Sequence, residues 1–254
     1  MIRVVFLGFG NVNYNLCNTL HKQPYVAVVQ IYNRSESAVS AAFNTIPFTH
    51  KLSEIVEADV YIIGITDDAI AAFSSSLPFK NQLVVHTSGG VSMEVLSDRN
   101  RKGVFYPLQT FSKQRAVDFT EIPICVEAAN PSDVVLLKKL GGYISEKVVE
   151  ITSEERAKLH LAAVFVNNFV NHMYAIGHEI LSENNIAFEL LQPLISETSS
   201  KILGLSPSEA QTGPAKRNDQ KTIEKHLHLL RDSEHLALYR QLTEAIRTKY
   251  GKKL

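Results

Sequence analysis

The sequence predicts an α/β protein of the Rossmann type, with a doubly wound and mostly parallel sheet followed by an all-helical C-terminal domain. In the first half of the chain, short β-rich runs alternate with helical ones, which is typical of βαβ units. Several of these runs are apolar at consecutive positions, as at 60–63, which indicates strands buried on both faces of a parallel sheet. After residue 151 the hydrophobic period becomes helical and stays so.

The first half of the chain supplies the elements of the predicted sheet in order. A strand at 3–7, a helix at 12–22 and a strand at 26–32 form the first βαβ unit. Further strands are expected at 59–65, 82–86, 103–106, 123–126 and 147–151, with helices at 36–43, after Asp67 and at 132–140.

The second half is predicted to be helical from Thr152 onward. Thr152 and Glu155 fit a capping box, in which each residue satisfies a backbone N–H group of the other. A helical pattern then continues to about Glu183. The predicted domains are therefore 1–151 and 152–254, and the later helices fall at 188–203, 219–230 and 233–250.

Composition and charge exclude several classes of partner. Lys and Arg number 26, as do Asp and Glu, so the 254-residue chain has no net charge with which to hold a nucleic acid. Cys17 and Cys125 each lie in an apolar stretch outside any Cys/His cluster, which predicts buried free thiols in a reducing compartment and no metal site. Without a signal-peptide pattern or a run of roughly 20 apolar residues, we expect a cytoplasmic protein without a membrane partner.

A glycine-rich turn follows the first predicted strand and precedes the first helix. It reads Gly8-Phe9-Gly10-Asn11-Val12-Asn13. Glycines let the backbone turn tightly and approach a pyrophosphate, while the free N–H groups of the helix N-terminus hold its charge. Gly8, Gly10, Asn11 and Val12 are therefore predicted to bind a dinucleotide. Asn13 replaces the third glycine of the usual fingerprint, and an ordinary strand-to-helix turn is the alternative interpretation.

The end of the second strand indicates which dinucleotide is bound. An NAD enzyme places an acidic residue there to bind the ribose 2′-hydroxyl, but this chain has Asn33, Arg34 and Ser35. A guanidinium group flanked by neutral donors suits a 2′-phosphate. We therefore expect NADP, and the alternative is a solvated arginine at a strand end.

Two more strand ends should lie at the same edge of the sheet, where ligands bind in open α/β folds. Thr66 and Asp67 follow the third long strand, and Ser88 and Gly89 follow the next. These four residues are predicted to contact the cofactor, with Ser88 also a candidate for catalysis. Helix capping by the aspartate and a simple turn at the glycine are the alternatives.

The long helix carries polar residues within an apolar sequence. At roughly 100° per residue, one stripe contains His160, Asn167, Asn171, Tyr174 and His178, with Asn168 further round. Such a stripe faces either a ligand or a hydrogen-bonded seam between helices or subunits. Histidine is the residue type suited to proton transfer near neutral pH, and His160 is our candidate for this role. Because this helix is too apolar for one small domain to cover, a homodimer through the helical domain is predicted.

A last loop, 211–219, contains a Gly213-Pro214 turn followed by Lys216 and Arg217. Such a loop can bind an anion, and it can equally be an exposed connection.

Taken together, these segments resemble a family of bacterial Rossmann-like proteins with a helical C-terminal domain of unknown function. That family is described as NADP oxidoreductases, is related to coenzyme F420-dependent NADP oxidoreductase, and more distantly to pyrroline-5-carboxylate reductase and the β-hydroxyacid dehydrogenases. The family has His and Gly where this chain has Tyr106 and Asn218. The resemblance is carried by Gly8–Val12, His86–Gly90, Pro107–Phe111, His160 with 162–165 and Asn168, Gly213-Pro214 with Arg217 and Asp219, and Thr222 with His226.

The resemblance implies an NADP-dependent oxidoreductase that acts on a small carbonyl, imine or hydroxyacid. Its helical domain would mediate dimerisation and complete the active site, with His160, Asn168 and Ser88 as catalytic candidates. The alternative is a non-catalytic dinucleotide sensor or assembly module, because a fold by itself does not define an activity.

Overall fold

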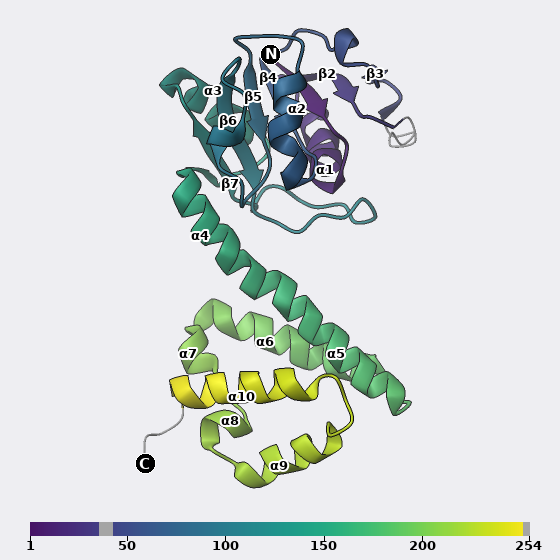
Figure 1. Cartoon of the computed structure of the whole chain (residues 1–254), viewed down its shortest axis with the longest axis vertical. Helices are drawn as coiled ribbons and strands as arrows, with labels where there is room; N and C mark the ends of the chain where they lie inside the picture. The colour runs from purple at the N-terminus through teal and green to yellow at the C-terminus, as the bar shows by residue number, and fades with distance from the viewer. Residues whose placement is uncertain (36–42, 251–254) are drawn as a thin grey trace. The chain divides into compact units, whose positions relative to one another are not determined.

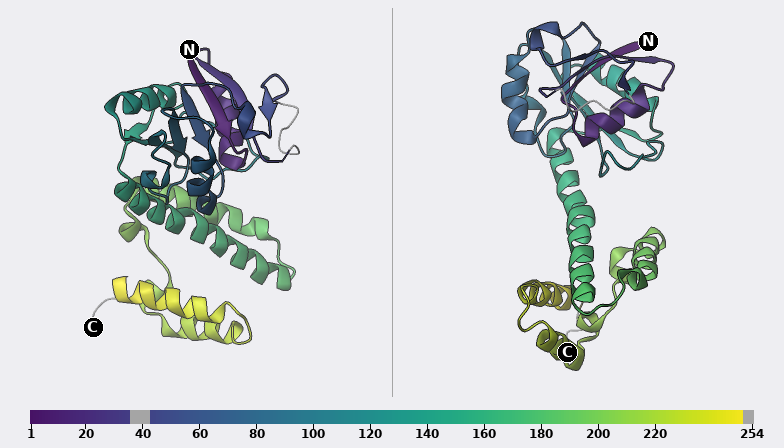
Figure 2. Two further views of the ribbon diagram at one scale, coloured as in Figure 1. Left: turned by 45° about the horizontal axis from the view of Figure 1, so that its top comes forward. Right: turned by 90° about the vertical axis from the view of Figure 1, so that its right-hand side faces the viewer.

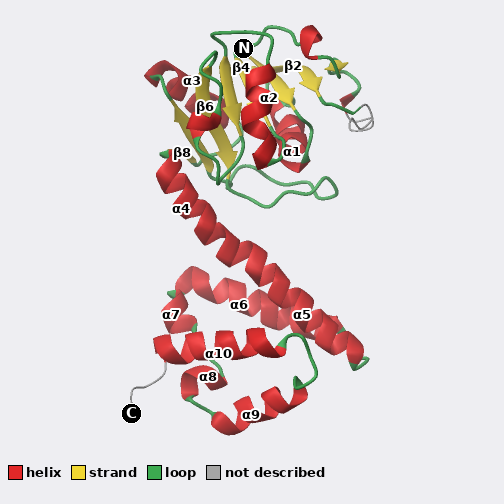
Figure 3. Ribbon diagram, in the orientation of Figure 1, coloured by secondary structure: helices red, strands yellow, loops and turns green. Residues whose placement is uncertain are grey.

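The computed structural model describes residues 1–35 and 43–250, and it divides into two compact units. The first, Met1–Asn168, holds the strands shown in yellow in Figure 3, and we call it the sheet unit. The second, Phe169–Leu254, is helical, and we call it the helical unit. This division falls within a helical stretch, 17 residues beyond the boundary at 151/152 (168 − 151 = 17), which stays a prediction.

The sheet unit contains one eight-stranded sheet in the order β3-β2-β1-β4-β5-β6-β7-β8 (Figure 1). All neighbouring strands are parallel except β6 and β7. The order reverses between β2 and β4 on either side of β1, which is the switch point of a Rossmann sheet. The strands are β1 (Ile2–Leu7), β2 (Val26–Tyr32), β3 (Phe48–Thr49), β4 (Val60–Ile63), β5 (Leu83–His86), β6 (Arg101–Pro107), β7 (Ile124–Ala128) and β8 (Val148–Glu150).

Helices cover both faces of this sheet. Apolar residues of α1 (Asn11–Leu20) and α3 (Pro131–Gly142) pack with Val4 and Phe6 of β1 in one core cluster. The next residues along β1, Val5 and Leu7, point to the other face and pack with α2 (Ile70–Ser76). In the right-hand view of Figure 2, α1 and α2 lie on opposite sides of the strands. The three layers explain why the strands are apolar at consecutive positions.

The structure confirms the predicted fold class and adds elements that the pattern did not contain. The two-residue strand β3, at one edge of the sheet, was not predicted because so short a run has no period. The helix predicted at 36–43 falls almost wholly outside the described residues. The long helix begins where predicted, since the Thr152 side chain accepts from the Glu155 N–H group and the capping box is complete.

The helical stretch that begins in the sheet unit contains α4 (Ser153–Ala163) and a π-helical segment, Val164–Phe169. The helical unit continues with α5 (Val170–Glu183), α6 (Gln192–Gly204), α9 (Gln220–Leu229) and α10 (Leu236–Tyr250), and with the short helices α7 (Pro207–Ala210) and α8 (Pro214–Arg217). The sequence pattern missed α7 and α8 because four residues form only one turn.

The helical unit encloses little apolar surface of its own. Among its described residues, only Ala215 and Ile223 are buried hydrophobics. Leu194 and Leu203 of α6 are 62% and 88% exposed. Polar contacts join the helices instead: His226 Nδ1 lies 2.8 Å from the Tyr239 hydroxyl. Large exposed apolar side chains of this kind are typical of interaction sites.

A buried ion pair fixes α4 to the sheet. Arg156, in the second turn of α4, is fully buried, and its guanidinium group donates to Glu127 of β7 and to the Val91 carbonyl. Glu127 also accepts from the Ser153 N–H and hydroxyl groups, at 2.9 and 2.7 Å. A buried charge is tolerated only when it is paired and hydrogen-bonded in this way.

Removing this arginine should destabilise the sheet unit strongly. Arg156→Met leaves the Glu127 carboxylate without its cation, and breaking a buried pair costs about 3–5 kcal/mol. Urea unfolding followed by circular dichroism measures the change. Lys158→Met is the matched control, because the Lys158–Glu154 pair is exposed and its loss should alter the free energy of unfolding by about 0.5 kcal/mol or less. Equal effects of the two substitutions would contradict the role given to Arg156.

Candidate functional site

A cleft of about 720 Å³ opens at the carboxyl ends of the central parallel strands. It is bounded by the turn between β1 and α1, by the ends of β2 and β4, and by α2. This is the switch point of the sheet, where open α/β folds bind their ligands. The lining residues are Gly8, Phe9, Gly10, Asn11, Val12, Tyr32, Asn33, Arg34, Gly64, Ile65, Thr66, Ala69, Ala72, Phe73 and Thr87.

The glycine-rich turn has the geometry that a pyrophosphate needs. Gly8 has a φ of +84°, and a Cβ atom there would lie 2.3 Å from Ile65 Cγ2 and 2.9 Å from the Gly64 oxygen. Gly10 precedes α1 and supplies no side-chain cap. The N–H groups of the first turn of α1 are therefore left for an anion at the positive end of the helix. The residues present fit a dinucleotide at this place.

Asn13 takes over the helix-to-strand contact that a third glycine usually makes. Its side chain is fully buried, and Nδ2 donates to the Gly8 and Ile62 carbonyls at 2.8 and 3.0 Å. Gly64 makes room for it, because a Cβ atom on Gly64 would lie 2.3 Å from Asn13 Cγ. In this protein the glycine that permits the close approach is Gly64 at the strand end, and the helix has Asn13 where the usual motif has a glycine.

This interlock predicts strong coupling between two substitutions. Gly64→Ala should destabilise the protein by about 1–3 kcal/mol, because the new methyl group overlaps the Asn13 side chain. In Asn13→Gly that side chain is gone, so adding Gly64→Ala should cost much less. A double-mutant cycle of urea unfolding measures the coupling, which we expect to reach about 1 kcal/mol or more. Additive effects would show that the two residues do not share this space.

The end of β2 brings Asn33 and Arg34 to the rim of the cleft. The Asn33 side chain serves the protein itself: Oδ1 accepts from the Phe9 N–H group at 3.1 Å, and Nδ2 donates to the Ser35 carbonyl at 2.9 Å. It ties the glycine-rich turn to β2. Arg34 and Ser35 are exposed beside it, and the Ser35 hydroxyl oxygen accepts from Asn33 Nδ2 at 3.3 Å.

The two other strand ends differ in their relation to the cleft. Thr66 lines it, whereas Asp67 is exposed in the 3₁₀ turn Asp67–Ala69. Ser88 is buried, and its hydroxyl oxygen accepts from the Gly90 and Val91 N–H groups, both at 3.2 Å. This oxygen shapes the loop after β5, while the hydroxyl hydrogen is still available to donate.

His86, at the end of β5, lies beneath that loop. It is fully buried, and its Nδ1 accepts from the Ser88 N–H group at 3.2 Å. Burial, together with the nearby Arg156 charge, lowers the pKa of His86 to about 4. The ring is therefore neutral at physiological pH and serves to hold the loop.

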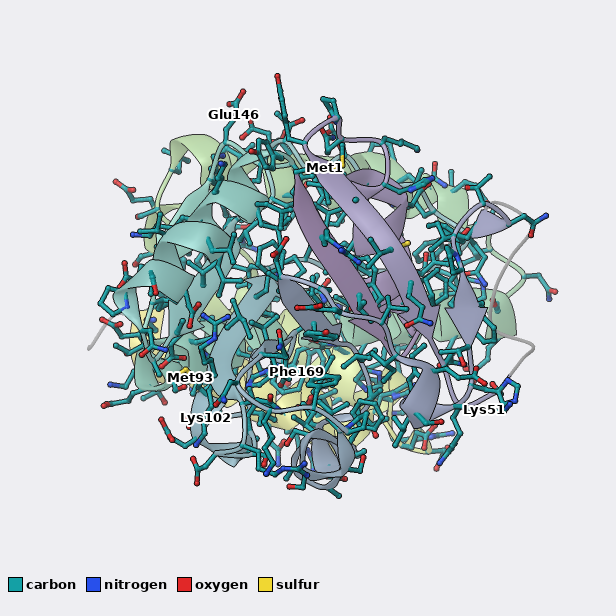
Figure 4. The ribbon with its side chains drawn as sticks, turned by 90° about the horizontal axis from the view of Figure 1, so that it is seen from above. Met1, Lys51, Met93, Lys102, Glu146 and Phe169 are labelled. Atoms are coloured by element: carbon teal, nitrogen blue, oxygen red, sulfur yellow. The ribbon has the colours of Figure 1, made fainter. Side chains whose placement is uncertain are left out.

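His160 meets the sheet at this same loop. Its Nδ1 lies 3.2 Å from the hydroxyl oxygen of Tyr106, the penultimate residue of β6. Gly89 lies directly against both rings, since a Cβ atom there would be 2.6 Å from His160 Nδ1 and 2.7 Å from Tyr106 Cζ. Met93, labelled in Figure 4, packs with Tyr106 and Cys125 in a small apolar cluster. The His160 imidazole is thus positioned by its own helix α4, by Tyr106 of β6 and by the loop after β5.

The π-helical segment changes which residue follows His160 along the helix. The predicted stripe assumed 100° per residue, but a π turn contains one more residue than an α turn. A position eight residues on, rather than seven, therefore returns to the same face. Asn168, rather than Asn167, therefore lies on the same face of the helix as His160. Asn167 and Asn168 are both exposed. The stripe as predicted was wrong for this reason.

The loop 211–219 folds into α8 and its caps. Gly213 has a φ of +104° and Asn218 one of +57°, so an asparagine occupies the left-handed position. Asp219 caps α9 by accepting from the Thr222 N–H group at 3.1 Å, and Ala215 is buried. The Lys216 ammonium donates to the Gln211 carbonyl at 2.7 Å. The loop is an ordered turn, and its anion-binding role stays a prediction.

The fold and the cleft define the class, a Rossmann-type α/β protein with a helical C-terminal region. Residues 122–246 match the domain of unknown function DUF2520. A "putative NADP oxidoreductase" from Bacteroides fragilis is 39% identical, with a TM-score of 0.90 over 97% of this chain and 98% of that one. The chain therefore belongs to the same family as that protein.

Two further structures are similar in fold. A protein from Thermotoga maritima is 20% identical, with a TM-score of 0.82 over 98% of this chain and 100% of that one. Pyrroline carboxylate reductase from Plasmodium falciparum, with NADP bound, is 12% identical, with a TM-score of 0.61 over 98% and 97%. A search of curated proteins gave no match. No helix within 1–35 and 43–250 is long and apolar enough to cross a membrane.

Sequence reasoning missed three residues on which the site depends. Tyr106 was noted as a departure from the family, but nothing local links it to a residue 54 positions later. Gly64 follows a buried strand, as many turn glycines do. In the sequence, Arg156 does not differ from the other basic residues of the predicted helices. Its spacing of four residues from His160 was the one signal that it shares a helix face with a site residue.

Proposed function

We propose that this protein is an NADP-dependent oxidoreductase that transfers hydride to or from a small carbonyl, imine or hydroxyacid. The observation that carries the proposal is the uncapped N-terminus of α1 at the 720 Å³ cleft, with a positioned imidazole at a neighbouring strand end. The family relationship to a protein named as an NADP oxidoreductase supports it. The nicotinamide cofactor supplies the hydride, and the chain supplies binding, orientation and proton transfer.

The cofactor would be held by residues that the cleft already presents. Gly8, Gly10, Asn11 and Val12 would hold the pyrophosphate through backbone N–H groups. Thr66 would flank the same cleft. Gly89, whose Cβ position is filled by the His160 and Tyr106 rings, would contact the cofactor through its backbone. Asp67 and Ser35 lie at the edges of this surface and stay candidates for contact with the ribose groups.

We place a 2′-phosphate at Arg34, and hence prefer NADP to NAD. Arg34 lines the cleft and is exposed, and the side chain beside it is the neutral Asn33. Among the described residues that line the cleft, none has an acidic side chain, so a 2′-phosphate would meet no repulsion from them. A guanidinium group binds phosphate through charge-assisted hydrogen bonds.

Replacing Arg34 should therefore remove most of the preference for NADPH. A charge-assisted phosphate contact contributes about 1.5–3 kcal/mol, so Arg34→Ala should weaken NADPH binding more than tenfold and leave NADH binding nearly unchanged. Calorimetry with both cofactors measures this. Arg99→Ala is the control, because Arg99 lies away from the cleft and donates to the Ser75 carbonyl. Equal affinity of the wild type for NADPH and NADH would refute the assignment.

The proton chemistry is assigned to His160, with Asn168 and Ser88 as polar neighbours. His160 is held at Nδ1 by Tyr106, which directs its other nitrogen away from that contact. The Asn168 amide would orient the substrate, and the Ser88 hydroxyl would donate to the cofactor or substrate from its loop. Consumption of NADPH with small carbonyl and imine compounds tests the activity. Tight binding without turnover of any of them would favour a dinucleotide sensor.

The helical unit is proposed to form a homodimer with a second copy of the chain. Support comes from its scarcity of enclosed apolar residues and from the exposure of Leu190, Leu194 and Leu203, at 70%, 62% and 88%. A second copy is the one partner that is always present at equal concentration. Closed two-fold contacts are also the commonest form of soluble oligomer.

Light scattering coupled to gel filtration should give twice the 28.3 kDa mass of the chain. Leu194→Asp places a charge in the middle of the proposed contact and should shift the protein toward a monomer, because burying an unpaired carboxylate is costly. Lys221→Gln, on α9, is a control for charge, because it changes the net charge by the same −1. A wild-type monomer at micromolar concentration would overturn the dimer.

We also assign the protein to the cytoplasm. Cys17 and Cys125 are both free and buried. Thiols in this state are typical of a reducing compartment.

A further inference from the structure

The contact between Tyr106 and His160 is a polar contact between strand β6 and helix α4. Tyr106 is 8% exposed and lies within β6, while His160 is half-buried on α4. The hydroxyl oxygen and Nδ1 are 3.2 Å apart, and the two rings meet edge to face with centroids 6.1 Å apart.

The surroundings of the pair leave little freedom for either ring. Gly89 is pressed against both, and any side chain there would overlap His160 Nδ1 and Tyr106 Cζ. Gly90 lies beside the other edge of the imidazole, with its Cβ position 3.9 Å from Nε2. One turn before His160, the buried Arg156–Glu127 pair holds α4 against the sheet. The geometry is therefore built by three independent constraints.

We propose that Tyr106 and His160 form a proton relay, Tyr106 Oη–H to His160 Nδ1 and His160 Nε2–H to the substrate, and that the substrate is a carbonyl compound. This inference rests on the proposed function and names the substrate class of that same site. His160 is the catalytic residue, and Tyr106 is a positioning residue that acts through it. In the resting site the tyrosine hydroxyl donates to Nδ1, which fixes the Nε2–H tautomer.

The proton balance of the relay requires a carbonyl. Hydride addition to the carbonyl carbon moves the π electron pair to oxygen and gives an alkoxide. As the alkoxide O–H bond forms, the Nε2–H bond breaks, Nδ1 takes the proton of the Tyr106 hydroxyl, and tyrosinate remains. Nδ1 then returns its proton to the tyrosinate while water protonates Nε2, which restores the resting Nε2–H tautomer. Each turnover therefore consumes one proton, as reduction of a carbonyl to an alcohol does. A protonated imine receives hydride and becomes a neutral amine, so it needs no such donor.

The energetics favour transfer in this direction. Burial raises the pKa of Tyr106 to about 12, so the tyrosine enters each cycle as the neutral donor. An alkoxide is about as basic as hydroxide and far more basic than a tyrosinate, so the proton still moves downhill. A neutral imidazole acting as an N–H donor at a carbonyl has a precedent in triosephosphate isomerase.

The charged and titratable groups around the pair do not compete for this role. Cys125 of β7 lies opposite Tyr106, and burial raises its thiol pKa, so it stays neutral. The Arg156 charge lowers the tyrosine pKa slightly and is itself paired with Glu127. His86 beneath the loop is neutral at physiological pH because its pKa is about 4.

A substrate-free measurement tests the resting geometry. Nitrogen-15 correlation spectra of the imidazoles, with His160 assigned by comparison with His160→Gln, should show the Nε2–H tautomer at pH 8.5. Tyr106→Phe should shift His160 toward a mixture of tautomers, because Nδ1 has lost its donor. Tyr25→Phe is the matched control. Tyr25 directly precedes β2, is 61% exposed and stacks on Tyr143. An Nδ1–H tautomer in the wild type, or no change in Tyr106→Phe, would overturn the relay.

Turnover with NADPH tests the substrate class. The probes are 4-nitrobenzaldehyde and pyridine-3-carboxaldehyde as carbonyls, and 2-methyl-1-pyrroline as an imine. We expect aldehyde reduction with a kcat that stays flat between pH 7 and 9, and a loss of roughly 10²–10⁴-fold in both Tyr106→Phe and His160→Gln, with NADPH affinity kept. An imidazolium donor would instead give a kcat that falls about tenfold per pH unit once it is titrated.

The outcomes separate this inference from the function on which it rests. Absence of NADPH binding, with the tautomer preference intact, would refute the proposed function and leave the pair a structural contact. NADPH-dependent reduction that Tyr106→Phe leaves unchanged would refute the relay and keep the proposed function. Reduction of the imine alone would refute the carbonyl assignment.

Discussion

The buried pair between Arg156 and Glu127 is the interaction on which the geometry of the candidate site depends. It joins α4 to β7, and through the Val91 carbonyl it also holds the loop that follows β5. His160 lies one helical turn beyond Arg156, so the position of its ring relative to Gly89 and Tyr106 is set by this anchor. A hydrophobic pair would stabilise the contact equally well or better, but it would not specify orientation in the same way. Directional hydrogen bonds from a planar guanidinium group fix both the distance and the rotation of the helix.

At the other side of the switch point, the cleft depends on close packing around glycines. Gly8 and Gly64 allow the β1–α1 turn, the end of β4 and Asn13 to occupy a space that Cβ atoms would fill. The same packing leaves the first turn of α1 with its N–H groups directed at the cleft. The two sides of the switch point therefore differ in the groups they present. Backbone N–H groups face the cleft where an anion would bind, and polar side chains gather at the loop after β5. A hydride-transfer enzyme needs both, because the cofactor must be held while a proton moves nearby.

The helical unit presents a different problem. Its helices are amphipathic, yet its described residues enclose only Ala215 and Ile223 as buried hydrophobics. Apolar surface of this extent is costly in water, and in the proposed homodimer a second copy of the chain would cover it. Folding of this unit and assembly would then be linked, so that stability depends on protein concentration.

The sequence alone determined the fold class, the order of strands β1, β2, β4 and β5, the glycine-rich turn and the capping box at Thr152, because each rests on a local period or on a motif whose physics acts within a few residues. It also predicted roles for His160 and Arg34, which stay predictions. Only the tertiary structure decided what these residues face. Tyr106 reaches His160 across 54 positions, Gly64 admits Asn13 across 51 (64 − 13 = 51), and Glu127 pairs with Arg156 across 29. The π-helical segment altered the phase of the long helix, and a fixed angle per residue does not reveal it. Such contacts depend on how elements distant in the chain pack together, and one sequence records the elements without recording their packing.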